Sequence, residues 1–80
     1  MTRTLTVYSR TGCHLCEQLL AQLAHLDLPD DVSLVTVDVD ADPALRARFD
    51  VDVPVVALDD EILCCHFLDE TALRQALNDG

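Results

Sequence analysis

Leu5-Thr6-Val7-Tyr8 and, after a short loop, Cys13-His14-Leu15-Cys16 decide the fold of this chain. The first run is rich in residues that favour β-strands, and leucines at helical spacing after Cys13 predict a helix. Two thiols at this spacing lie one turn apart on one face of a helix. The pair can therefore close into a disulfide and reopen without movement of the backbone.

The position of the two thiols at a helix start favours redox chemistry. A helix N-terminus supplies partial positive charge and free N–H groups, which favour the thiolate of Cys13. Disulfide exchange requires such a thiolate beside a second thiol, so Cys13 is the expected nucleophile and Cys16 the resolving thiol. The same spacing also occurs as half of a zinc site, so the surrounding elements have to decide between the two.

Composition predicts a single small domain, residues 1–80, with enough apolar residues to fill one core. Half of the 80 residues are hydrophobic, which argues against disorder. The chain has five arginines, no lysine and fifteen acidic residues, which gives a formal net charge of −10. Nucleic acid and anionic membrane are therefore excluded as expected partners, because both need a basic surface.

Cysteine usage and the first residues predict a cytoplasmic protein. Residues 1–4 lead directly into the first expected strand without an apolar signal segment, and no run approaches a membrane span. Cys64 and Cys65 are adjacent and cannot easily bond each other, so the spacing does not fit a secreted disulfide scaffold.

The apolar pattern predicts four strands and three helices. The strands are expected at residues 4–9, 32–39, 55–58 and 61–67, and the helices at 13–26, after Asp42-Pro43 and after Asp69. The crossover rule makes the first two strands parallel, and the turn Asp59-Asp60 makes the last two antiparallel. We expect the valine-rich strand 32–39 to be buried. The fold class is thus α/β, in the order βαβαββα, with a four-stranded mixed sheet flanked by helices.

Three stretches of the sequence carry a family resemblance. They are residues 8–17 with both thiols, Val37-Asp38-Val39-Asp40, and Asp52-Val53-Pro54-Val55-Val56. Because these three stretches occur in this order, the chain resembles the glutaredoxin branch of the thioredoxin fold. It is most similar to the small glutaredoxin-like proteins of bacteria. The resemblance extends over essentially the whole chain and implies the thioredoxin/glutaredoxin fold.

The resemblance also implies a substrate-binding set around the thiols. It places Pro54 in a cis peptide bond facing the cysteine pair, with the backbone of Val53 exposed to pair with substrate. Arg10 stands where glutaredoxins usually carry a lysine, and this cation would stabilise the Cys13 thiolate or hold a ligand carboxylate. His14, when protonated, would favour the same thiolate and make the disulfide more oxidising.

The sequence departs from glutaredoxins just before the last helix. Glutaredoxins have Gly-Gly and an aspartate there to hold glutathione, whereas this chain has Cys64-Cys65, His66-Phe67-Leu68 and then Asp69. Close backbone approach needs glycine, so weak or absent glutathione binding is expected. Cys64 and Cys65 should point to opposite faces of a strand, one into the core and the other toward the redox site as a possible third thiol.

The sequence therefore predicts a thiol–disulfide oxidoreductase without a bound cofactor or metal. The expected substrate is a disulfide-containing protein or a small thiol, the reductant is of thioredoxin or glutathione type, and the chain is expected to be a monomer. Two alternatives stay open at this point. One is a metal-binding or delivery protein that uses Cys13, Cys16, one of Cys64/Cys65 and His66. The other is a catalytically silent interaction domain with the same fold.

Overall fold

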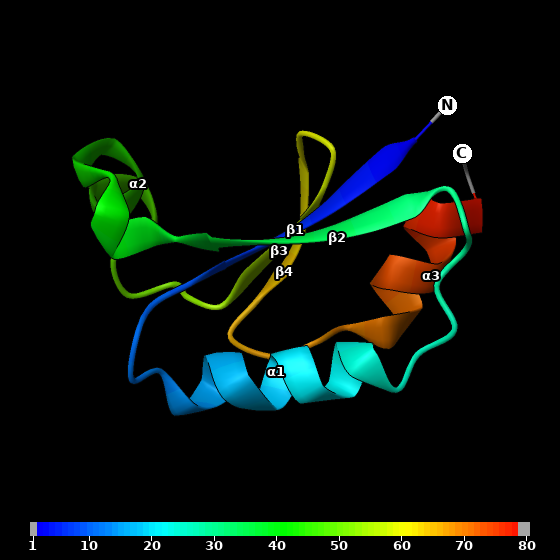
Figure 1. Ribbon diagram of the computed structural model, residues 1–80, viewed down its shortest axis with the longest axis horizontal. Helices are drawn as coiled ribbons and strands as arrows, with labels where there is room; N and C mark the ends of the chain where they lie inside the picture. The colour runs from blue at the N-terminus through cyan, green and yellow to red at the C-terminus, as the bar shows by residue number, and fades with distance from the viewer. Residues whose placement is uncertain (1, 79–80) are drawn as a thin grey trace.

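A four-stranded mixed sheet forms the centre of the computed structural model, which describes residues 2–78. The strands are β1 (Arg3–Ser9), β2 (Val32–Asp38), β3 (Val55–Leu58) and β4 (Glu61–Cys65), in the spatial order β2-β1-β3-β4. β1 pairs with β2 in parallel, whereas β3 runs antiparallel to both β1 and β4. The predicted fold class, including both strand-pair directions, is confirmed (Figure 1).

Three α-helices and a short 3₁₀ helix flank this sheet. They are α1 (His14–Ala24), η1 (Val39–Ala41), α2 (Pro43–Phe49) and α3 (Glu70–Asn78). α1 and α3 lie on one side of the sheet, and α2 lies past the end of β2 (Figure 1). Asp42 and Asp69 begin their helices as predicted, because their Oδ1 atoms accept hydrogen bonds from the N–H groups of Ala44 at 2.9 Å and Ala72 at 3.0 Å.

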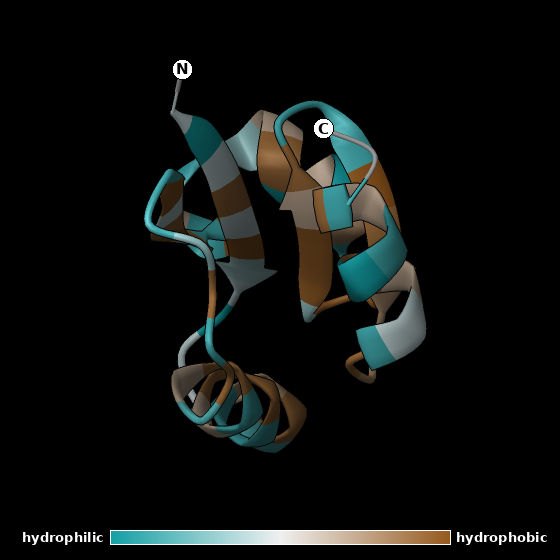
Figure 2. Cartoon of the chain, turned by 90° about the vertical axis from the view of Figure 1, so that its right-hand side faces the viewer, coloured by the Kyte–Doolittle hydropathy of each residue, from teal (hydrophilic) through white to brown (hydrophobic). Residues whose placement is uncertain are grey.

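The core divides into two clusters on the two faces of the sheet. The larger cluster fills the space between the sheet and helices α1 and α3, and its buried members are Leu5, Val7, Leu19, Leu23, Val56, Leu58 and Leu73. The smaller cluster lies toward α2 and contains Cys16, Val39, Phe49, Val53 and Val55. Hydrophobic bands alternate with paler bands along β1 (Figure 2), because successive side chains of a strand point to opposite faces. The second cluster is the one that holds a thiol of the Cys-x-x-Cys pair.

The prediction that strand 32–39 is buried is wrong. β2 is the edge strand of the sheet, and Leu34 and Val35 are 43% and 41% exposed. A valine-rich strand is typical of a central position, but in this sheet β1 lies between β2 and β3, and β2 has a neighbour on one side only. The seven residues of α2 are too few to cover β2 along its length.

Several predicted element bounds differ by one residue, and two ends shift by two residues. The last strand was expected to reach Phe67 but ends at Cys65, because His66 has a φ of 68° and leaves the extended conformation. The first helix ends at Ala24, and the N–H of His25 caps it through the carbonyl of Gln22 at 3.1 Å. Among residues 2–78, no helix is long and apolar enough to cross a membrane.

Candidate active site

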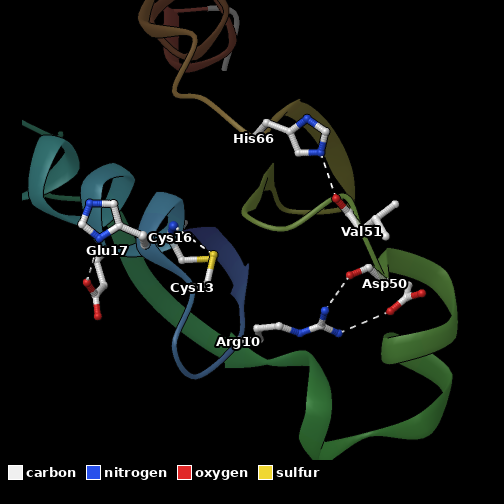
Figure 3. The surroundings of a disulfide bond; sticks show 8 residues. Arg10, Cys13, Cys16, Glu17, Asp50, Val51 and His66 are labelled. Carbon is white, nitrogen blue, oxygen red and sulfur yellow. Dashed lines mark hydrogen bonds and ion pairs between the residues drawn. A yellow bond between two sulfur atoms is a disulfide. The ribbon is translucent and has the colours of Figure 1, made fainter.

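Cys13 and Cys16 form a disulfide at the start of α1, with their Cα atoms 5.2 Å apart (Figure 3). Cys13 is the N-cap residue of the helix, with an extended backbone at φ −85° and ψ 107°, and it is half-buried. Cys16, one turn further on, is only 2% exposed. Thus the two sulfurs differ in access: a partner can approach Cys13, while Cys16 lies inside.

The cap geometry places a hydrogen-bond donor on the sulfur of Cys13. Its Sγ accepts from the backbone N–H of Cys16 at 3.1 Å, in the way that a serine or aspartate oxygen caps a helix. After reduction, the same N–H and the positive end of the helix dipole would stabilise a negative charge on this sulfur. Sequence and local geometry therefore favour Cys13 over Cys16 as the thiolate.

Packing shields Cys16 from the opposite side. Its neighbours in the smaller core cluster include Val39, Phe49 and Val53, which come from three different segments of the chain. The ring of Tyr8 stacks at a tilt on Phe49, with centroids 4.6 Å apart. Cys16 is thus fixed by the core, and a large substrate cannot reach its sulfur directly.

The loop from Asp50 to Pro54 passes beside the disulfide and is held at two successive carbonyls (Figure 3). Arg10 Nη1 donates to the carbonyl oxygen of Asp50 at 2.9 Å. On the other side, Nε2 of His66 lies 3.0 Å from the carbonyl oxygen of Val51. The backbone N–H of His66 also donates to the carbonyl of Pro54 at 2.8 Å. The Val53–Pro54 peptide bond within this loop is cis.

His66 and Val51 are parts of the site that sequence reasoning missed. The sequence pattern indicates His66 only as a metal ligand, and it does not indicate Val51. The contact joins residues 15 positions apart, on the turn after β4 and the loop before β3. No short sequence pattern predicts a contact between residues this far apart. A non-glycine residue at positive φ is the structural signal, and it is visible only once the backbone is known.

The four predicted substrate-binding residues differ in their exposure and in the contacts of their side chains. The Arg10 guanidinium is engaged by Asp40 Oδ1 at 3.1 Å and Asp50 Oδ1 at 3.5 Å. His14 is exposed, and its Nδ1 lies 3.7 Å from a carboxylate oxygen of Glu17. Val53 and Pro54 are both buried. The roles given to these four residues in substrate binding stay predictions.

Cys64 and Cys65 are free thiols on opposite faces of β4. Cys64 pairs with Val56 and packs against the larger core cluster, and burial raises the pKa of its thiol. Cys65 pairs with Val55 and is exposed. Within residues 2–78, no three His, Cys, Asp or Glu side chains are gathered so that they could hold a metal ion. The structure therefore does not assemble the ligand set of the metal alternative.

The architecture and the helix-start disulfide define a protein of the thioredoxin fold, and comparison with known proteins narrows the class. A family model described as glutaredoxin-like domain (DUF836) matches residues 4–78, so the chain belongs to the glutaredoxin-like domain family. An uncharacterized protein of Mycobacterium tuberculosis is 37% identical over 71 residues, which cover 82% of this chain and 73% of the relative.

Solved structures agree with this assignment. The solution structure of a Nitrosomonas europaea protein has a TM-score of 0.82 at 33% identity and covers 95% of this chain and 92% of its own. A mutant thioredoxin from Halobacterium salinarum has a TM-score of 0.60 at 26% identity, with 96% and 73% covered. Mitochondrial thioredoxin 3 from Saccharomyces cerevisiae, in its oxidized form, has a TM-score of 0.65 at 22% identity, covers 98% and 78%, and shows the fold alone. The predicted family resemblance is confirmed.

Proposed function

We propose that the chain is a thiol–disulfide oxidoreductase with Cys13 as nucleophile and Cys16 as resolving thiol. The observation that carries this proposal is the asymmetry of the disulfide at the start of α1. The accessible sulfur of Cys13 accepts the N–H of Cys16, whereas the sulfur of Cys16 is buried. In this arrangement the accessible thiol attacks the substrate disulfide, and the buried thiol then releases the substrate from the mixed disulfide.

The reaction transfers two electrons and two protons to a substrate disulfide. The Cys13 thiolate attacks one sulfur of the substrate, the substrate S–S bond breaks, and the departing thiolate takes a proton from water. Cys16 then loses its proton and attacks the Cys13 sulfur of the mixed disulfide, which releases the second substrate thiolate to be protonated. The protein is left with its Cys13–Cys16 disulfide. A thioredoxin-type or glutathione-type reductant returns both electrons in a second exchange.

Substrate would lie between the start of α1 and the loop before β3. In this proposal the substrate backbone reaches Val53, which is still 8% exposed, and the fully buried Pro54 acts by shaping the loop. His14, which is exposed at the helix start, faces solvent and the partner. Arg10 contributes chiefly through the loop that it holds, since Asp40 and Asp50 already compensate its charge. Its donor to the Asp50 carbonyl keeps that loop beside the disulfide.

Glutathione is proposed to be a weak ligand. The segment that replaces Gly-Gly carries the side chains of Cys64 and Cys65, and it is followed by His66, whose imidazole reaches toward Val51. These side chains occupy positions where glycine would let a tripeptide backbone approach. A formal charge of −10 also disfavours an anionic peptide. The proposed physiological setting is a cytoplasmic monomer acting on disulfide-containing proteins or small thiols.

Two variants and a small aromatic disulfide test the oxidoreductase proposal. The reduced wild-type protein should release two equivalents of aromatic thiol per molecule of aromatic disulfide and end as the intramolecular disulfide. Cys16→Ser should release one equivalent and stop as a mixed disulfide on Cys13, detected by its mass, and Cys13→Ser should react far more slowly. Cys64→Ser and Cys65→Ser serve as matched controls and should behave like wild type. A silent interaction domain would give equal, slow reaction of all thiols in every variant.

A further inference from the structure

Two large apolar side chains next to His66 are exposed. Val51 is 78% exposed and Phe67 is 68% exposed. Both are neighbours of His66, the first through its carbonyl contact and the second as the next residue of the chain. Two large apolar groups at the surface are positions where a partner side chain would bury apolar area.

A cleft continues this surface along α1. It lies between the helix and the turn after β4, and we call it the Leu15–Phe67 cleft. The helix contributes Leu15, Gln18 and Gln22 to its lining, and the turn contributes His66, Phe67 and Leu68. Leu15 belongs to the Cys-x-x-Cys segment itself and is the residue before Cys16, so one end of the cleft is formed by the segment that carries the disulfide. A residue close to a substrate cysteine could therefore place an apolar side chain here.

Two carboxylates lie next to residues that line the cleft. Asp52 Oδ1 lies 4.0 Å from Nε2 of His66, and Asp69 is the residue after Leu68. Glu17 is the residue after Cys16, on the other side of the disulfide (Figure 3).

The arginines of the chain do not offset these carboxylates. Arg10 is shared by two carboxylates, Arg3 pairs with Asp31 and Arg74 pairs with Glu70. Arg46 and Arg48 belong to α2, away from the cleft. None of the arginines that form these ion pairs is therefore engaged with Asp52 or Asp69, and a lysine or arginine of a partner can pair with them.

We infer that the Leu15–Phe67 cleft and the two carboxylates next to it select polypeptide disulfides whose cysteine is flanked by an apolar residue and by lysine or arginine. This inference rests on the proposed function, and it names the substrate class of the same site. The apolar neighbour fills the cleft, and the cations lie against Asp52 and Asp69. The electrons and protons move as in the exchange through Cys13 and Cys16, so no further reactant is required.

Two synthetic peptide dimers test this selection. Each peptide has one cysteine and one leucine beside it, and each dimer is joined by the disulfide between its two cysteines. One version has two lysines next to the cysteine and the other has two glutamates. Reduced protein is mixed with each dimer at low salt, and the rate of peptide release is followed by chromatography. The rates with dithiothreitol, which also attacks through a thiolate but has no binding surface, remove the effect of the peptide charges on the disulfide itself.

After this normalisation, the lysine dimer should react about tenfold faster than the glutamate dimer at low salt, and the ratio should fall toward one in molar salt. The double variant Asp52→Asn, Asp69→Asn should reduce the ratio about threefold. Asparagine still caps a helix, so Asp69→Asn changes the charge and leaves the start of α3 in place. Asp60→Asn, in the turn between β3 and β4, is the matched control and should leave the ratio unchanged.

Phe67→Ser tests the apolar part, and should slow both dimers about equally while the small aromatic disulfide reacts as before. Equal normalised rates for the two dimers would overturn the inference, as would an unchanged ratio in the double variant. If the aromatic disulfide reacts as proposed while the dimers show no selection, only this inference fails. If no disulfide reacts through Cys13, the proposed function itself fails.

Discussion

The Nε2 atom of His66 lies 3.0 Å from the carbonyl oxygen of Val51, and this contact joins the turn after β4 to the loop before β3. Arg10 donates to the preceding carbonyl, that of Asp50, from the opposite side. Two side chains from distant parts of the sequence thus hold adjacent peptide units of one loop. That loop forms the wall of the site opposite the disulfide (Figure 3).

Substitutions at His66 should separate its side-chain contact from its backbone strain. His66→Ala loses the hydrogen bond and keeps a φ of 68°, so it should lower the free energy of unfolding by about 1 kcal/mol. His66→Gly loses the same bond but relieves the left-handed backbone, and should be about 1 kcal/mol more stable than the alanine variant. Urea unfolding of both variants measures the difference. An alanine variant as stable as the glycine variant would show that the positive φ is not strained.

The ion pair between Arg3 and Asp31 should make stability depend on pH in the acid range. Hydrogen bonds from Arg3 to Asp31, at 3.0 and 3.3 Å, hold the pKa of this carboxyl below its ordinary value of 3.8. A carboxyl with a lowered pKa in the folded state stabilises the fold above its ordinary pKa. This stabilisation is lost as the pH falls through the lowered value.

Asp31→Asn should therefore be less stable than wild type at neutral pH, and the difference should close below the ordinary pKa of the carboxyl. Unfolding free energies of both proteins from neutral pH down into this acid range check the expectation. Asp30→Asn, at the neighbouring exposed acid, is the control and should show a smaller difference at neutral pH. A difference that persists in strong acid would assign the effect to something other than the ion pair.

The four thiols should differ in their rates of alkylation once the disulfide is reduced. Cys13 should react first near neutral pH, because the N–H of Cys16 and the helix start stabilise its thiolate. Cys65 is exposed and should follow, whereas Cys64 should be slower than Cys65 because burial raises its pKa. Peptide mapping after brief alkylation gives the order. Faster labelling of Cys65 than of Cys13 would contradict the assignment of the nucleophile.

Reduced glutathione should bind weakly to the Cys16→Ser variant, which cannot close its own disulfide. Calorimetric titration should give a dissociation constant of about 1 mM or weaker, since side chains replace the glycine pair and the carboxylates outnumber the free cations. Binding should not strengthen when salt is lowered, because the protein and the tripeptide are both anionic. Micromolar binding would mean that Cys64, Cys65 and His66 leave the glutathione site open.

Local sequence signals predicted most of the fold. The helix caps at Asp42 and Asp69 and the turn at Asp59-Asp60 depend on neighbouring residues, and all three are present. The error at β2 arose because burial of a strand depends on which strands flank it, and composition alone does not tell this. A string of valines is compatible with a central strand or with an edge.

The candidate site, like the fold, has parts that local sequence predicts and parts that depend on distant residues. The Cys13–Cys16 pair is a local pattern, so sequence predicted the disulfide correctly. The contact of His66 with Val51 depends on how the β3–β4 hairpin returns to the loop before it. The engagement of Arg10 by Asp40 and Asp50 is equally non-local. The sequence places Arg10 close to the thiols, but it does not predict that carboxylates from two other segments form ion pairs with its guanidinium.

A redox titration of the wild-type protein tests the central claim most directly. The protein is equilibrated in buffers of defined ratios of reduced to oxidised dithiothreitol, alkylated and mapped by mass spectrometry. We predict that Cys13 and Cys16 gain and lose their labels together along a two-electron curve, with about 30 mV for each tenfold change in the equilibrium. Cys64 and Cys65 should carry labels at every potential. If Cys13 and Cys16 stayed labelled throughout, or if either formed its disulfide with Cys64 or Cys65, the account would be contradicted.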